Sequence, residues 1–231
     1  MGELAVSVVV PTRNRADYLE VALRSLAEQE GGVPYEVVVV DDHSSDATPE
    51  VAARAGVRRV EPASSGGLNA ARNAGVDATS GPLVAFVDDD IWAPPGWVRA
   101  LAAGAGAHPG AHAFGGPIRA RLEGPAPRGC GRESAPITTL DLGTEDRDAA
   151  MVWGANLAVR RSAFESFGRF DDAVGGHGDI DLVSLGLLFR LGRAPAPAPA
   201  PAPRAQSAAP PPVVVPVVET ERYACRAGVC G

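Results

Sequence analysis

The chain has 231 residues, a net charge of −7 and 45% hydrophobic residues, which suits one globular domain with a sizeable core plus an extension. The acidic charge argues against a nucleic-acid-binding surface, because such surfaces attract phosphates through Lys and Arg. The three cysteines, two of them in the last seven residues, indicate neither a disulfide framework nor a zinc site.

No targeting segment or membrane span is predicted. The first apolar run, residues 5–10, is short and follows no basic segment, which is unlike a signal peptide. No stretch reaches the roughly 18 apolar residues expected of a bilayer-spanning helix. The sequence favours a cytoplasmic location, with peripheral membrane contact left open.

Short apolar runs alternate with helical patterns over the first half of the chain. The runs are nearly continuous in apolar residues, which is typical of strands covered on both faces in a parallel sheet. We expect strands at 4–10, 36–40, 57–60 and 83–87, and helices at 16–28, at 49–55, after Gly66-Gly67 and from Pro94-Pro95 to about 103. This alternation predicts an α/β domain with a mostly parallel central sheet flanked by helices.

The second half of the chain is less regular. Strands are expected at 111–118 and 151–159, helices at 162–167 and 182–191, and a long loop at 119–147. From Ala194 the sequence changes to Ala-Pro repeats, which favour polyproline II and forbid helix. We therefore predict a folded domain over 1–193 and a Pro/Ala-rich, disordered or extended tail over 194–231, in which 213–218 could form an edge strand.

Three of the predicted strands end in polar clusters, at residues 12–14, 41–42 and 88–90. In a parallel sheet these strand ends share one edge, which is where ligands bind. Adjacent carboxylates repel one another, and Mg²⁺ or Mn²⁺ with a bound phosphate would offset that repulsion. This pattern favours a metal and diphosphate site over an acidic, solvated turn. The sequence contains neither a dinucleotide-binding glycine loop after the first strand nor a P-loop.

Four stretches, in order, resemble a family 2 glycosyltransferase of the GT-A fold. They are Val8–Arg15; Val38–Thr48, which is similar to the family's "VVDDGSTDGT"; Ala70–Gly75 with Phe86–Asp90, which is similar to its "ARN-G" and DXD pair; and Asn156–Arg161 through Gly168–Asp171 to Asp179–Leu182, which is similar to its acceptor half. The resemblance covers about residues 4–191. It implies metal-dependent, inverting transfer of a sugar from a UDP-, GDP- or dTDP-sugar to a hydroxyl of a glycan, a lipid-linked acceptor or a small molecule.

The resemblance also implies roles for single residues. Asp90 would bind the divalent metal, and Asp179 would act as the general base on the acceptor hydroxyl, with Asp181 as its competitor. Asp42 would accept a hydrogen bond from a base N–H, and Arg13 stands where many relatives carry an aromatic residue. The residues assigned to the nucleotide are Pro11, Thr12, Arg13, Asn14, Asp42, Arg72, Asp88 and Asp89. Those assigned to the acceptor are Trp153 and Asn156.

The chain departs from the family pattern toward its C-terminus. The Glu that usually precedes the base is replaced by Gly178, and Val215 or Pro216 stands in the place of a late His. A nucleotide-sugar-binding protein without turnover is therefore an alternative. A nucleotidyltransferase, which shares the sheet and the carboxylate chemistry, is a weaker one.

Overall fold

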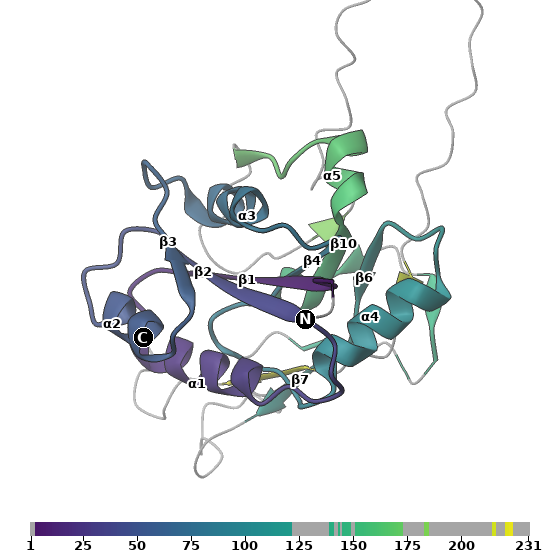
Figure 1. Ribbon diagram of the computed structural model, residues 1–231, viewed down its shortest axis with the longest axis horizontal. Helices are drawn as coiled ribbons and strands as arrows, with labels where there is room; N and C mark the ends of the chain where they lie inside the picture. The colour runs from purple at the N-terminus through teal and green to yellow at the C-terminus, as the bar shows by residue number, and fades with distance from the viewer. Residues whose placement is uncertain are drawn as a thin grey trace, which may run out of the picture.

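The computed structural model describes residues 3–121, 139–140, 143, 145–148, 151–172, 183–184, 214–215 and 220–223. In these residues a mixed sheet lies between two layers of helices (Figure 1). The central sheet contains β1 (Val6–Thr12), β2 (Tyr35–Asp41), β3 (Arg58–Val60), β4 (Leu83–Phe86), β6 (Ala113–Gly115) and β10 (Leu157–Arg160). The helices are α1 (Ala16–Ala27), α2 (Thr48–Arg54), α3 (Gly67–Ala78), α4 (Trp97–Ala107) and α5 (Arg161–Phe167).

The strand order of the central sheet is β3-β2-β1-β4-β10-β6. β1 is parallel to both β2 and β4, whereas β10 runs antiparallel to β4 and β6. The chain moves outward from β1 through β2 and β3, then returns to the other side of β1 with β4. The switch point of the topology therefore lies between β1 and β4, and the loops that follow these two strands leave the sheet side by side.

Helices cover both faces of the sheet: α1, α2 and α4 lie on one face, and α3 and α5 on the other (Figure 1). All seven residues of β1 are buried, which explains its continuous apolar sequence. Val8 belongs to the core cluster that contains Leu19 of α1, and Val9 to the cluster that contains Ala71 of α3. A Cβ on Gly75 of α3 would overlap the Val9 side chain, so α3 needs glycine there to approach β1 this closely.

The predicted alternation of strands and helices over the first half of the chain is confirmed, with one helix start that is wrong. α4 begins at Trp97 and not at Pro94-Pro95. Pro94 precedes a proline, which disfavours helical backbone at that position. A turn closed by Trp97 N–H donating to Pro94 O comes before the helix.

Two predicted strands in the second half are each divided. The strand expected at 111–118 is β6 and β7 (Ile118–Arg121), separated by Gly116 and by Pro117, which has no N–H to donate to a strand ladder. The strand expected at 151–159 is β9 (Met151–Val152), a 3-10 turn (Gly154–Asn156) and β10.

Strands toward the C-terminus pair with the domain. The helix expected at 182–191 is wrong at its described residues, because β11 (Val183–Ser184) pairs with β9, and tertiary pairing outweighs local helical spacing. β12 (Val214–Val215) pairs with β8 (Arg147–Asp148), and β13 (Thr220–Tyr223) lies between β5 (Ile91–Trp92) and β7. Part of the predicted tail thus returns to the domain, whereas the Ala-Pro repeats and the boundary at 193 lie outside the described residues.

Candidate functional site

Thr12, the last residue of β1, connects the three polar clusters at the carboxyl edge of the sheet. Its hydroxyl donates to Asp89 Oδ2 at 2.7 Å, in the loop after β4. Its carbonyl oxygen accepts from Asp42 N–H at 2.9 Å, in the loop after β2. Thr12, Asp42 and Asp89 are all buried. The loops after β1, β2 and β4 therefore form one continuous, polar site at the switch point of the sheet.

Arg15 pairs with the acidic loop, which consists of residues 88–90 after β4. Its Nε lies 3.2 Å from Asp89 Oδ1, and its Nη2 lies 3.2 Å from Asp90 Oδ2. Both carboxylates are nearly inaccessible, whereas 40% of the Arg15 side chain is exposed, and its guanidinium lies 4.6 Å from the centre of the Tyr18 ring. Arg15 belongs to the stretch that resembles the family, but the sequence analysis assigned it no role, although its positive charge could have suggested a pair with the three acids.

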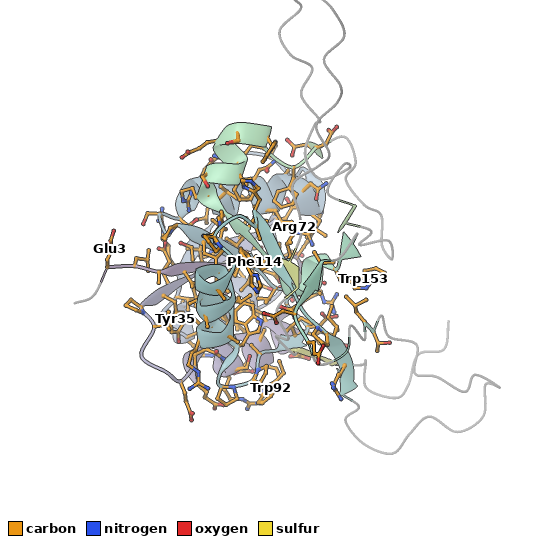
Figure 2. The ribbon with its side chains drawn as sticks, turned by 90° about the vertical axis from the view of Figure 1, so that its right-hand side faces the viewer. Glu3, Tyr35, Arg72, Trp92, Phe114 and Trp153 are labelled. Carbon is orange, nitrogen blue, oxygen red and sulfur yellow. The ribbon has the colours of Figure 1, made fainter. Side chains whose placement is uncertain are left out.

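Arg72 brings a second positive charge to the acidic loop, from the interior. It projects from α3, is 2% exposed, and its Nη2 lies 3.7 Å from Asp88 Oδ1. Figure 2 shows Arg72 inside the molecule, and its guanidinium carbon lies 5.8 Å from the centre of the Phe170 ring. A guanidinium at this depth attracts phosphate strongly, because little water screens its charge.

Asp42, Ser65 and Arg13 form a hydrogen-bonded network at the other end of the site. Ser65 Oγ donates to Asp42 Oδ2 at 2.9 Å, and Arg13 Nη1 donates to Ser65 Oγ at 2.9 Å. Arg13 Nη1 also lies 3.5 Å from Asp42 Oδ2. Asp42 Oδ1 is buried and accepts no hydrogen bond from any described residue. A buried carboxylate oxygen that lacks a donor is costly, and it is suited to accept from a ligand N–H.

Asn14 and Asp41 hold the loops of the site together. Asn14 has a left-handed backbone (φ 52°), and its Oδ1 accepts from Ser45 N–H at 2.7 Å. Asp41 is fully buried and pairs with Arg59 at 2.7 Å. Pro11, which was also assigned to the nucleotide, is a buried residue of β1 opposite Val40. The contacts of these residues shape the site.

The two residues assigned to the acceptor lie in different environments. Asn156 is fully buried, where its Oδ1 accepts from Trp97 Nε1 at 3.0 Å and its Nδ2 donates to Pro117 O at 3.3 Å. These hydrogen bonds hold its side chain in the interior. Because the side chain has no exposed surface, its position does not favour contact with an acceptor. Trp153 is partly exposed and lies toward one side of the molecule (Figure 2). Asp179, the predicted base, lies outside the described residues, as does Asp181.

The acidic loop fits a metal ion that is shared with a ligand. Among the described residues, no three His, Cys, Asp or Glu side chains are grouped so that they could hold an ion by themselves. Mg²⁺ and Mn²⁺ in phosphate-transfer sites commonly take one or two carboxylates and complete their shell with phosphate oxygens and water. Asp89 and Asp90 can supply such carboxylates.

The sequence profile described as Glycosyl transferase family 2 matches residues 7–168. The chain is 31% identical over 186 residues to the pre-mycofactocin glycosyltransferase of Mycobacterium tuberculosis. The matched region covers 77% of this chain and 38% of that protein. It is 35% identical over 106 residues to the putative glycosyltransferase EpsH of Bacillus subtilis, which covers 44% of this chain and 30% of EpsH. The chain therefore spans less than half the length of these curated relatives.

Solved structures with a similar fold include complexes with UDP-GlcNAc and with GDP-Man. The structure of S. aureus TarS in complex with UDP-GlcNAc has a TM-score of 0.66 at 18% identity, covering 97% of this chain and 60% of that chain. The mannosyltransferase PcManGT from Pyrobaculum calidifontis, in complex with GDP-Man and Mn²⁺, has a TM-score of 0.55 at 24% identity. The match covers 74% of this chain and 48% of that chain. These similarities confirm the predicted GT-A fold.

Proposed function

The chain belongs to glycosyl transferase family 2, and we propose that it transfers a sugar from a nucleotide-sugar donor to an acceptor hydroxyl. The observation that carries this proposal is the order of charges along the edge between β2, β1 and β4. At one end lies an oxygen of Asp42 that accepts from no described residue, and beside the acidic loop lies the buried guanidinium of Arg72. This order matches a ligand with a base N–H at one end and a diphosphate at the other.

The diphosphate would lie at the acidic loop. Asp90, together with Asp89, would hold Mn²⁺ or Mg²⁺, and Asp88 would contact the ribose or a water molecule on the metal. The bound ion would neutralise charge on the departing nucleoside diphosphate. Arg72 supplies positive charge to the same group from a fixed and buried position. This charge stabilises the negative charge that develops on the diphosphate as the sugar bond breaks.

The acceptor hydroxyl would attack the sugar in a single displacement with inversion. Its oxygen forms the new bond to the anomeric carbon while the bond to the diphosphate oxygen breaks, and Asp179 takes the hydroxyl proton. The acceptor class (glycan, lipid-linked or small molecule) is left open by this proposal. Trp153, which is partly exposed, is the better placed of the two residues assigned to the acceptor.

The location of the protein remains a prediction from the sequence. In the part of the chain that the structure describes, no helix has both the length and the apolar character needed to cross a membrane.

Calorimetric titration of the full chain with UDP, GDP and dTDP, each with and without Mn²⁺, tests the proposal. We expect metal-dependent binding of at least one nucleotide, weakened more than about tenfold in Asp90→Ala because a charge-assisted contact is lost. Asp179→Asn should bind the nucleotide normally and transfer no sugar. Binding with neither transfer nor donor hydrolysis would instead support a binding protein, pyrophosphate release from a nucleoside triphosphate would indicate a nucleotidyltransferase, and absence of binding would overturn the proposal.

A further inference from the structure

We infer that the base of the donor is uracil or thymine, and that Ser65 sets this preference by occupying one oxygen of Asp42. The inference rests on the proposed nucleotide binding and makes it more specific. It concerns the network of Arg13, Asp42 and Ser65 at the end of the site remote from Arg72.

The two carboxylate oxygens of Asp42 differ in what they can accept. Oδ2 already accepts from the Ser65 hydroxyl at 2.9 Å and lies 3.5 Å from Arg13 Nη1. Oδ1 is buried and accepts from no described residue. Asp42 as a whole is 6% exposed, so water has little access to satisfy Oδ1. The site therefore presents one strong acceptor to a base, and not the pair that a carboxylate offers when both of its oxygens are accessible.

The Watson–Crick edges of the bases differ in how they fit one acceptor. Uracil and thymine present a single N–H, at N3, between two carbonyl oxygens. Guanine presents two adjacent donors, N1–H and N2–H, which match both oxygens of a carboxylate. Cytosine presents the lone pair of N3 at the position where uracil has its N–H, so N3 would repel the Asp42 carboxylate and only the neighbouring N4 amino group could donate to it. One acceptor therefore favours uracil and thymine, since guanine would leave one of its two donors without a partner on Asp42.

Arg13 strengthens this match. Its side chain is 56% exposed, and a guanidinium carries five N–H donors on one plane. Nη1 is directed to Ser65 and Asp42, at 2.9 and 3.5 Å. The other nitrogens of the guanidinium are donors only. They can donate to a carbonyl oxygen beside the base N–H, and they repel an amino group at the same position. Uracil and thymine have a carbonyl on each side of N3, whereas guanine has its amino group on one side of N1.

The test is calorimetric titration of the full chain with UDP, dTDP, GDP and CDP at saturating Mn²⁺, repeated with Ser65→Ala and with Ser64→Ala as the matched control. Ser64 and Ser65 are both exposed, and the hydrogen bonds to Asp42 and Arg13 in the described residues come from Ser65. We expect wild type to bind UDP or dTDP at least about tenfold more tightly than GDP and CDP, the ratio that one charge-assisted hydrogen bond provides. Ser65→Ala gives Oδ2 to the ligand, so the preference over GDP should fall about tenfold, while Ser64→Ala should leave it unchanged.

Three outcomes decide against the inference. GDP binding as tight as UDP and dTDP binding in wild type overturns it and leaves the proposed function standing. An unchanged preference over GDP in Ser65→Ala overturns the role of Ser65. It would mean that the Ser65 hydroxyl does not keep guanine from using Asp42 Oδ2 as a second acceptor. Binding of none of the four nucleotides overturns both this inference and the proposed function.

Discussion

The guanidinium of Arg72 lies directly against the backbone of Gly154: a Cβ atom at Gly154 would overlap Arg72 Nη2. Gly154 begins the turn between β9 and β10, and Arg72 projects from α3 toward Asp88. The absence of a side chain at 154 therefore determines where the buried positive charge can lie. Residues more than eighty positions apart in the sequence together build the part of the site that faces the acidic loop.

Gly154→Ala should weaken nucleoside diphosphate binding by displacing Arg72. Because Arg72 is buried, its guanidinium has little room to move away, and a shift of its charge from the diphosphate should cost about tenfold in affinity. Calorimetry of Gly154→Ala, Arg72→Ala and the double variant checks this. If Gly154→Ala acts through Arg72, it should have almost no further effect in the Arg72→Ala background, and equal effects in both backgrounds would contradict the relationship.

Arg15→Gln should increase the affinity of the nucleotide-free protein for Mn²⁺. The Arg15 guanidinium pairs with both Asp89 and Asp90, so it competes with a cation for the same carboxylates. Two positive charges about 4 Å apart repel by a few kcal/mol at an effective dielectric near 20, and exposure of Arg15 reduces this further. We expect a gain of several-fold, measured by electron paramagnetic resonance of free Mn²⁺.

Arg13→Gln is the control for the metal experiment, because Arg13 contacts Asp42 and Ser65 at the other end of the site. It removes the same charge and should change Mn²⁺ affinity less. Weaker Mn²⁺ binding in Arg15→Gln would show that Arg15 orients the carboxylates for the ion and does not compete with it.

Asn73→Ala should lower the free energy of unfolding by about 1–3 kcal/mol. Asn73 joins α3 to the chain after α5: its Oδ1 accepts from Phe170 N–H at 3.0 Å, and its Nδ2 donates to Phe170 O at 3.0 Å and to Asp172 Oδ1 at 2.7 Å. Removing the amide leaves the backbone groups of buried Phe170 without these partners. Urea unfolding followed by circular dichroism gives the value.

Asp77→Ala, one turn further along α3, is the matched variant for Asn73→Ala. Asp77 forms an exposed ion pair with Arg169, and such pairs contribute about 0–1 kcal/mol. Equal losses in Asn73→Ala and Asp77→Ala would mean that the contacts of Asn73 with residues 170–172 contribute no more than a surface ion pair.

Asp46→Asn should make the free energy of unfolding depend less on pH at acidic pH. Asp46 Oδ1 accepts from Thr48 N–H at the start of α2, and its Oδ2 accepts from Ala16 N–H at the start of α1. The pKa of Asp46 is lowered, chiefly by a hydrogen bond from the Thr48 side chain. A carboxyl group whose pKa is lower in the folded state stabilises that state above its unfolded value, near 3.8, and this stabilisation is lost as pH falls through the lower folded value.

Urea midpoints at pH 7 and between pH 4 and 3 check this prediction. The difference between wild type and Asp46→Asn should be largest at pH 7 and should shrink as pH falls below about 4. Asp17→Asn, at an exposed acid in the first turn of α1, controls for the general loss of a negative charge at a helix start. A difference between wild type and Asp46→Asn that does not change with pH would contradict the assignment.

Much of the fold could be predicted from the sequence because it depends on local patterns. The Val-rich runs and the helical spacing placed the strands and helices of the first half, and the position of polar residues after the strands placed the edge that carries the site. The family resemblance placed Asp42, Arg72 and the acidic loop. Two strand breaks were not predicted. One lies at Pro117, which has no N–H to donate to a strand ladder, and the other lies at Gly154, which contacts Arg72 from a distant part of the chain.

Local sequence determined which elements form and which residues reach the carboxyl edge of the sheet, because strand and helix periodicity need only near neighbours. Tertiary structure alone decided which groups meet there: Arg15 with Asp89 and Asp90, Ser65 with Asp42, and Gly154 with Arg72. Each of these contacts joins segments that are separated by tens of residues, and the residue types alone do not reveal which distant segments meet. The residue types therefore predict the kind of ligand, whereas the hydrogen bonds among these residues depend on the tertiary structure.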